Sequence, residues 1–186
     1  MSRAMSRAGF TLIELCVVLL LAAILLAIAA PNLTTAIHRQ QLKTATDDLY
    51  RALALTRSAA LERGTRVELA PLDPDGRNWS AGWSVFVDAN GNQRPDPGEE
   101  VIARHGPVAT GIAIRSAMSS QAQPDYLAYN GAGRACSAAA ALAPRFGSVS
   151  LSYEGQLRRI TINMLGRARV CDPARDGAAC GGAGAD

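Results

Sequence analysis

The segment GFTLIEL, residues 9–15, opens an apolar run that continues almost without interruption to Ala30. The 21 residues from Phe10 to Ala30 contain one charged residue, Glu14. At about 1.5 Å per residue, a helix of this length spans a hydrocarbon core of about 30 Å. A carboxylate at the centre of a membrane helix costs about 2.5–3.5 kcal/mol, so Glu14 requires an explanation beyond anchoring.

Two ordinary explanations of this run are a signal peptide and a plain membrane anchor. A secretory signal peptide has an apolar core of about 7–15 residues and then a small-residue cleavage site, which residues 27–29 could provide. The run is too long for that class, and Glu14 lies inside it. A plain anchor fits the length but leaves Glu14 unexplained. Arg3 and Arg7 precede the run, so we expect the rest of the chain outside the inner face.

The third explanation is a resemblance. Gly9 and Phe10, followed by Glu14 and the apolar run, resemble the processing site of type IV pilins and type II secretion pseudopilins. The resemblance implies that a prepilin peptidase removes residues 1–9 and methylates the new N-terminus. It also implies a helix-kinking role for Pro31 and an assembly role for Glu14. In a filament, Glu14 would meet the Phe10 amine of a neighbouring subunit, which offsets the cost of burying either charge.

The sequence after residue 30 is amphipathic. Apolar residues recur mostly at three- and four-residue spacing between Leu33 and Ala60, and Gly64 is placed as a C-terminal stop. We therefore expect one long helix. Residues 10–30 would be its transmembrane or filament-core half, and residues 31–64 its amphipathic half.

Residues 65–171 are expected to form a β-rich periplasmic head. Short alternating segments, separated by clusters of Gly, Pro, Asn and Asp, predict seven strands. They are Arg66–Ala70, Trp83–Asp88, Glu100–His105, Gly111–Arg115, Tyr126–Tyr129, Ser148–Tyr153 and Leu157–Leu165. The Gly- and Ala-rich residues 172–186 are predicted to be a flexible tail.

Residues 79–102 resemble the GspH/FimT group of minor pilins and pseudopilins, through WSAGWSVFVD followed by an acidic turn and GEEVI. The predicted class is therefore α+β and type IV pilin-like. A long N-terminal helix, its first half transmembrane, would pack on a C-terminal antiparallel β head domain.

The chain contains four cysteines. Cys16 lies in the predicted membrane span. Cys136, Cys171 and Cys180 would face an oxidising compartment, where disulfides persist. Three cysteines cannot all pair internally, so one bridge and one leftover thiol are expected, and the sequence leaves the pairing open.

Residues 88–99 have the ligand spacing of a calcium loop. Oxygen-bearing side chains occupy positions 1, 3, 5, 9 and 12, namely Asp88, Asn90, Asn92, Asp96 and Glu99. Gln93 stands at the sixth position, where an EF-hand requires Gly, and strands rather than helices are predicted on both sides. A solvated hairpin turn explains the same residues, and we prefer it to the calcium alternative.

The sequence carries no signature of an enzyme or of a cofactor site. His38 and His105 are too few and too far apart to suggest a metal site, and there is no glycine-rich phosphate loop or Cys-x-x-Cys motif. We therefore expect a protein that is not an enzyme and has no cofactor.

Basic charge gathers late in the chain. Residues 66–125 carry five Arg against eight Asp or Glu, whereas residues 126–171 carry six Arg against one Glu. In the last predicted strand, alternation places Arg158 on a largely buried face and Arg159 on the polar face. If that register continues through Gly166, Arg167 and Arg169 join the polar face. Their guanidinium groups, about 7 Å apart, would suit successive phosphates.

The sequence GRAR at residues 166–169 resembles the motif of FimT-type minor pilins that bind DNA during natural transformation. The resemblance implies that Arg167 and Arg169 contact DNA, and Arg159 and Arg158 would assist them. A solvated edge strand, in which arginines block association between sheets, explains the same residues.

The predicted function is that of a minor type IV pilin that binds DNA without sequence specificity during DNA uptake. The alternatives are a structural minor pilin that primes pilus assembly, and a minor pseudopilin of a type II secretion system. The expected partners are other pilins in a filament, prepilin peptidase, the inner membrane and DNA. The head would face the periplasm before assembly and the cell surface afterwards.

Overall fold

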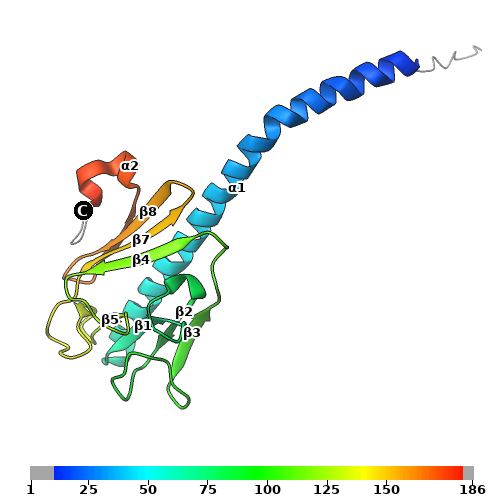
Figure 1. Ribbon diagram of the computed structural model, residues 1–186. Helices are drawn as coiled ribbons and strands as arrows, with labels where there is room; N and C mark the ends of the chain where they lie inside the picture. The colour runs from blue at the N-terminus through cyan, green and yellow to red at the C-terminus, as the bar shows by residue number, and fades with distance from the viewer. Residues whose placement is uncertain (1–10, 182–186) are drawn as a thin grey trace, which may run out of the picture. The chain divides into compact units, whose positions relative to one another are not determined.

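One helix dominates the N-terminal part of the chain. The computed structural model describes residues 11–181, without the side chains of residues 26–32, and α1 runs from Leu12 to Arg63 (Figure 1). The chain divides into two compact units, residues 1–38 and 39–186.

The first unit contains the apolar run. Its large side chains from Leu12 to Leu25 are exposed, Leu12 by 81% and Leu25 by 68%. None of the helices in residues 11–181 combines the length and apolarity that crossing a membrane requires. Phe10 and the side chains of residues 26–30 of the predicted span lie outside the described part.

The helix ends where the sequence places its stop. Gly64 follows Arg63 with a φ of +65°, a left-handed conformation that glycine adopts without a steric penalty. Arg63 in the last turn is also favourable, because a cation there complements the helix dipole.

In the second unit, residues 39–63 of α1 bury one apolar stripe. The first four of its members recur at three- and four-residue spacing. The members are Leu42, Ala45, Leu49, Leu53, Ala59 and Ala60. Thr46 and Thr56 are buried on the same part of the helix. Their hydroxyls donate to the carbonyls of Leu42 and Ala52 at 2.7 Å, which satisfies both polar groups inside the core.

The strands form two antiparallel sheets, as Figure 1 shows. The five-stranded sheet has the order β3-β2-β1-β5-β6. Its strands are β1 (Val67–Pro71), β2 (Trp83–Phe86), β3 (Val101–His105), β5 (Leu127–Tyr129) and β6 (Ala135–Cys136). The four-stranded sheet has the order β4-β7-β8-β9. Its strands are β4 (Ala113–Met118), β7 (Gly147–Tyr153), β8 (Gln156–Ile162) and β9 (Ala168–Cys171).

The main core joins the α1 stripe to both sheets. Val67 and Leu69 of β1 enter it from the first sheet, and Val149 and Ile160 enter it from the second. All four side chains are fully buried. The α1 stripe and one face of each sheet therefore share a single apolar core.

The five-stranded sheet is covered on its other face as well. A second apolar cluster contains Ala70, Phe86, Tyr126, Ala128 and Cys136. Every residue of β1 is consequently buried. Because successive strand residues alternate between faces, Glu68 points to this second face rather than to solvent.

The predicted α+β pilin-like architecture is confirmed. The seven predicted strands correspond to β1–β5, β7 and β8, and β6 and β9 are additional. The last prediction, residues 157–165, was too long. β8 ends at Ile162 and the chain turns at Gly166. Continued alternation after Ile160 and Ile162 would have placed Met164 on the buried face, but Met164 is 55% exposed.

We expect Leu53→Ala to lower the free energy of unfolding of the fragment 39–186 by about 2–5 kcal/mol, because Leu53 is fully buried. Urea denaturation, followed by the fluorescence of the buried Trp79 and Trp83, measures this loss. The matched control is Leu55→Ala on the same helix, where the side chain is 38% exposed. Equal losses in the two variants would contradict the packing described here.

Candidate nucleic-acid interface

The β8–β9 connection is a tight turn held by Asn163. Its side-chain Oδ1 accepts hydrogen bonds from the backbone N–H groups of Leu165 at 3.1 Å and Arg167 at 2.9 Å. Gly166 has a φ of +76°, and a Cβ there would lie 2.5 Å from the carbonyl oxygen of Gly133. Only glycine fits this position, which is the first residue of the GRAR motif.

The turn returns the chain beside β8, so the polar face forms across two strands and not along one. Arg169 pairs with Thr161, and Arg159 pairs with Cys171. Residues directly opposite in an antiparallel pair share a face. Arg159, Thr161 and Arg169 therefore lie on the same side of the sheet. The register does not continue through Gly166.

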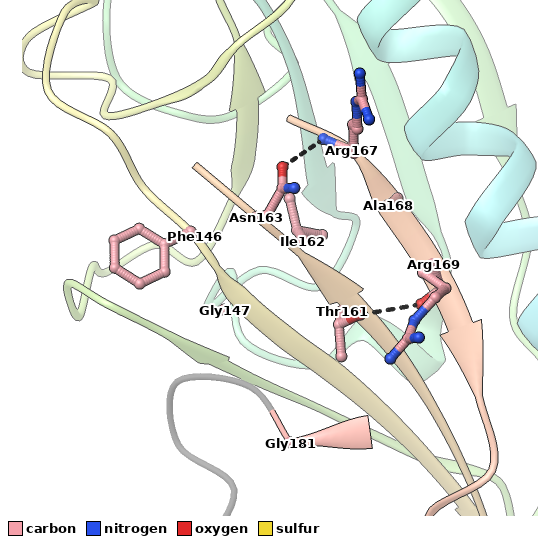
Figure 2. Close-up of a pocket in the computed structure, with 9 residues that line it drawn as sticks. All are labelled: Phe146, Gly147, Thr161, Ile162, Asn163, Arg167, Ala168, Arg169 and Gly181. Atoms are coloured by element: carbon pink, nitrogen blue, oxygen red, sulfur yellow. Dashed lines mark hydrogen bonds between the residues drawn. The ribbon is translucent and has the colours of Figure 1, made fainter. Parts of the chain in front are cut away.

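Arg167 stands in the turn immediately before β9. Figure 2 shows the Arg167 and Arg169 guanidinium groups pointing in different directions from the two sides of Ala168. Both arginines are exposed. Together with Phe146, Thr161 and Asn163 they line a groove of about 610 Å³.

Arg158 lies on the opposite face from Arg159. Its guanidinium forms an ion pair with Asp172 at 2.6 Å and also donates to the Leu157 carbonyl at 3.0 Å. Arg159 donates instead to the Ser150 hydroxyl and to the Cys180 carbonyl. Of the two, only Arg159 shares a face with Arg169.

The C-terminal segment is fixed by a disulfide between Cys171 and Cys180, one of the pairings left open by the sequence. Cys136 is the leftover buried thiol, and burial raises its pKa to about 11, which makes it unreactive. Cys16 is a free, exposed cysteine.

The prediction of a flexible tail over residues 172–186 was wrong for its first part. Residues Pro173–Asp176 form α2, and Gly177–Cys180 form a 3-10 helix, η2. The Asp172 side chain caps α2 by accepting from Ala174 N–H at 3.1 Å. The cap and the disulfide order a segment whose composition suggests disorder. Residues 182–186 lie outside the described part.

This ordered segment contacts the basic face. Arg169 donates to the carbonyl of Ala179, and Arg159 donates to that of Cys180 at 3.3 Å. Both acceptors are neutral carbonyl groups, so the arginines are oriented while their charge stays uncompensated. Phe146 is the residue of the groove that sequence reasoning missed, because it lies outside every predicted strand and belongs to no motif.

The acidic turn is closed by its own side chains. The Asp88 carboxylate accepts from the backbone N–H groups of Gly91 at 2.7 Å and Gln93 at 3.0 Å. Both asparagine amides of the turn donate to Asp96, and these hydrogen bonds lower the pKa of its carboxyl. Glu99 accepts from two further N–H groups. The side chains predicted as calcium ligands therefore form hydrogen bonds within the turn itself, as the hairpin-turn alternative expects.

Within residues 11–181, no three His, Cys, Asp or Glu side chains form a group that could hold a metal ion. Calorimetric titration with calcium is the measurement that separates the turn from the calcium alternative.

Next to this turn, Glu68 is fully buried. Arg66 Nε lies 2.7 Å from Glu68 Oε1, and Arg66 Nη2 lies 3.8 Å from Asp88 Oδ2. The first contact is an ion pair and not a hydrogen bond, since neither carboxylate oxygen of Glu68 has a hydrogen-bond partner. Burial, with the neighbouring Asp88 carboxylate, raises the pKa of Glu68 to about 7, and Arg66 acts in the opposite direction.

Glu14, at the other end of the chain, caps its own helix. Its carboxylate accepts from the backbone N–H and from the hydroxyl of Thr11, each at 3.1 Å. The Thr11 hydroxyl in turn accepts from Glu14 N–H at 3.3 Å. This reciprocal pair is a capping box at the start of α1. Gly9 and Phe10, the predicted processing site, lie outside the described residues.

The long α1, the two antiparallel sheets and the N-terminal sequence motif together define a pilin-like subunit. The chain belongs to the family described as type II transport protein GspH, whose model matches residues 45–166. The model of the prokaryotic N-terminal methylation motif matches residues 4–30.

Individual relatives agree with this family. The chain is 30% identical over 167 residues to the pilin-like protein PilA1 of Thermus thermophilus, covering 89% of this chain and 99% of the relative. Its fold is similar to that of the type IV minor pilin FimU of Pseudomonas aeruginosa, with a TM-score of 0.56 and 18% identity over 74% of this chain and 92% of FimU. The minor pseudopilin EpsH of the Vibrio cholerae type 2 secretion system gives a TM-score of 0.50 and 15% identity, over 73% of this chain and 99% of EpsH.

The chain is therefore a pilin-like subunit of the GspH family, a structural protein and not an enzyme. Family membership implies other pilins and a prepilin peptidase as partners. The methylation motif is consistent with a membrane stage that precedes incorporation into a pilus.

We expect Glu14→Ala to prevent incorporation of the chain into filaments, because it removes the charge that would pair with the Phe10 amine. Glu14→Gln retains an acceptor for the capping box but removes the charge, so it should fail equally. Sheared filament fractions, probed for this subunit, measure incorporation. Normal incorporation of the Gln variant would show that Glu14 serves only as a helix cap.

The raised pKa of Glu68 makes stability depend on pH. Between about pH 4.5 and about pH 7 the folded chain holds a proton that the unfolded chain has lost, so stability falls as pH rises through this window. Glu68→Gln should remove that dependence and raise the free energy of unfolding above pH 7, by up to about 3 kcal/mol. Urea denaturation from pH 4 to pH 8 measures the effect. If the free energy of unfolding of the variant fell with pH as steeply as that of the wild type, Glu68 would not be the group that causes the pH dependence.

Proposed function

We propose that this minor pilin binds DNA through Arg167 and Arg169, without sequence specificity, as part of DNA uptake. The observation that carries the proposal is the uncompensated charge at the β8–β9 turn. Among residues 11–181, five arginines have a carboxylate partner, namely Arg51, Arg63, Arg66, Arg145 and Arg158. Arg159, Arg167 and Arg169 form no ion pair with any described residue.

Exposed arginines without carboxylate partners suit phosphates. A guanidinium group donates two parallel hydrogen bonds to phosphate oxygens, and its charge persists at any physiological pH. Such contacts position a protein on the nucleic-acid backbone but do not read bases. The proposed binding is therefore independent of sequence and weakens steeply with salt, because each neutralised phosphate releases counterions.

The second candidate function is that of a minor pseudopilin or a structural minor pilin without DNA binding. The description of the matching family model and the fold similarity to EpsH favour it. Under this alternative, the arginines protect β9, the edge strand of the four-stranded sheet, from pairing with other chains. Measurement of DNA affinity separates the two functions.

We expect the double variant Arg167→Ala/Arg169→Ala to lose at least tenfold in DNA affinity at physiological salt. On duplex DNA the slope of log K against log salt should also fall by about 2, since two phosphate contacts are lost. Gel-shift titrations at several salt concentrations measure both quantities.

A matched control removes the same charge elsewhere. Arg94 and Arg104 are exposed and lie in the β2–β3 turn and on β3, which belong to the five-stranded sheet and not to the sheet that carries the β8–β9 turn. Arg94→Ala/Arg104→Ala should retain most of the affinity. Equal losses in the two double variants would show that net charge, and not this turn, determines binding.

A further inference from the structure

The β8–β9 turn separates two grooves, and Arg167 and Ala168 line both of them. The first groove, of about 610 Å³, contains Phe146, Thr161 and Arg169. In Figure 2, Thr161 and Asn163 lie between Phe146 and the two arginines. The second groove has a volume of about 430 Å³ and lies between the turn and α1.

The second groove, like the first, is lined by aromatic residues and arginines. It contains Tyr50 and Arg57 of α1, with Leu61 and Tyr129. Tyr50 is 37% exposed. Arg57 donates to the Leu165 carbonyl at 3.3 Å, which holds its guanidinium beside the turn, and forms no ion pair with any described residue. Each groove is therefore lined by at least one aromatic residue and at least one arginine, and Arg167 lines both grooves.

Phosphate binding alone does not explain why aromatic residues line both grooves beside the arginines. A duplex keeps its bases stacked inside and offers the turn its phosphates, which arginines bind without any ring or groove. Grooves of about 300–1,000 Å³ are the size that accommodates small organic groups. A single strand can place its phosphates on arginines and stack its unpaired bases on aromatic side chains.

We infer that the two grooves bind unpaired bases, so that the preferred ligand of this surface is single-stranded DNA or the frayed end of a duplex. The inference rests on the proposed function and specifies its ligand. The phosphates of the strand cross the turn at Arg167. Adjacent bases enter the groove of Phe146 on one side and that of Tyr50 on the other.

The test compares a fluorescent single-stranded 20-mer with the duplex of the same length, using the full chain in detergent micelles. The wild type should bind the single strand at least tenfold more tightly at equal salt. Phe146→Leu and Tyr50→Leu keep the apolar volume but remove the rings. Each should weaken single-strand binding by about 5- to 150-fold, which corresponds to one lost stacking contact, and should leave duplex binding unchanged.

Tyr153→Leu is the matched control, because it removes a half-buried ring that lines neither groove. A second control is a single-stranded 20-mer of abasic sugar phosphate, which lacks the bases that would stack on the rings. Its affinity should match that of the duplex.

Equal affinity for single strand and duplex, with no effect of either ring variant, would overturn the inference and leave the proposed function standing. Equal loss of both ligands in the ring variants would also overturn it, since the rings would then act through the fold. If the wild type binds neither ligand, the proposed function itself fails.

Discussion

The apolar stripe of α1 between Leu42 and Ala60 is the contact on which the rest of the head depends. A sheet buries one face only when another apolar element covers it, and here one helix face serves both sheets. Because the stripe is shared, the four-stranded sheet is held in place by residues such as Val149 and Ile160, which belong to the same apolar cluster as the α1 stripe. The turn that carries Arg167 thus stands on a rigid element, which is what precise positioning of a binding side chain requires.

Within that frame, two local constraints arrange the basic face. Asn163 and Gly166 force the chain to reverse, and the disulfide of Cys171 with Cys180 returns the tail to the same side of the sheet. The carbonyls of that tail accept from Arg159 and Arg169 without neutralising them. The result is an oriented set of charges, in which less side-chain freedom is lost when a ligand binds.

The sequence predicted those parts of the molecule in which one periodicity persists over many residues. The α1 stripe and the stop at Gly64 follow from a 3.6-residue pattern and a glycine, and most strands follow from alternation. The reversal at Gly166 was missed, because GRAR is also compatible with a continuing strand until the approach of Gly133 is known. The tail was predicted as flexible from its composition, since pairing of Cys171 with Cys180 cannot be deduced from spacing. Phe146 and Arg57 reach the turn only through the tertiary fold.

The structure shows which of the unevenly distributed charges have partners within the fold. Several acidic residues before position 126 have partners of their own: Asp88 and Glu99 accept loop N–H groups, Glu100 pairs with Arg63, and Asp125 pairs with Arg145. Residues 126–171 contain a single acid, Glu154, so their arginines depend on carboxylates from elsewhere. Asp172 supplies one to Arg158, and no described carboxylate reaches Arg167 or Arg169. Exposed charges left without an internal partner contribute little to folding, and they remain available to an external anion.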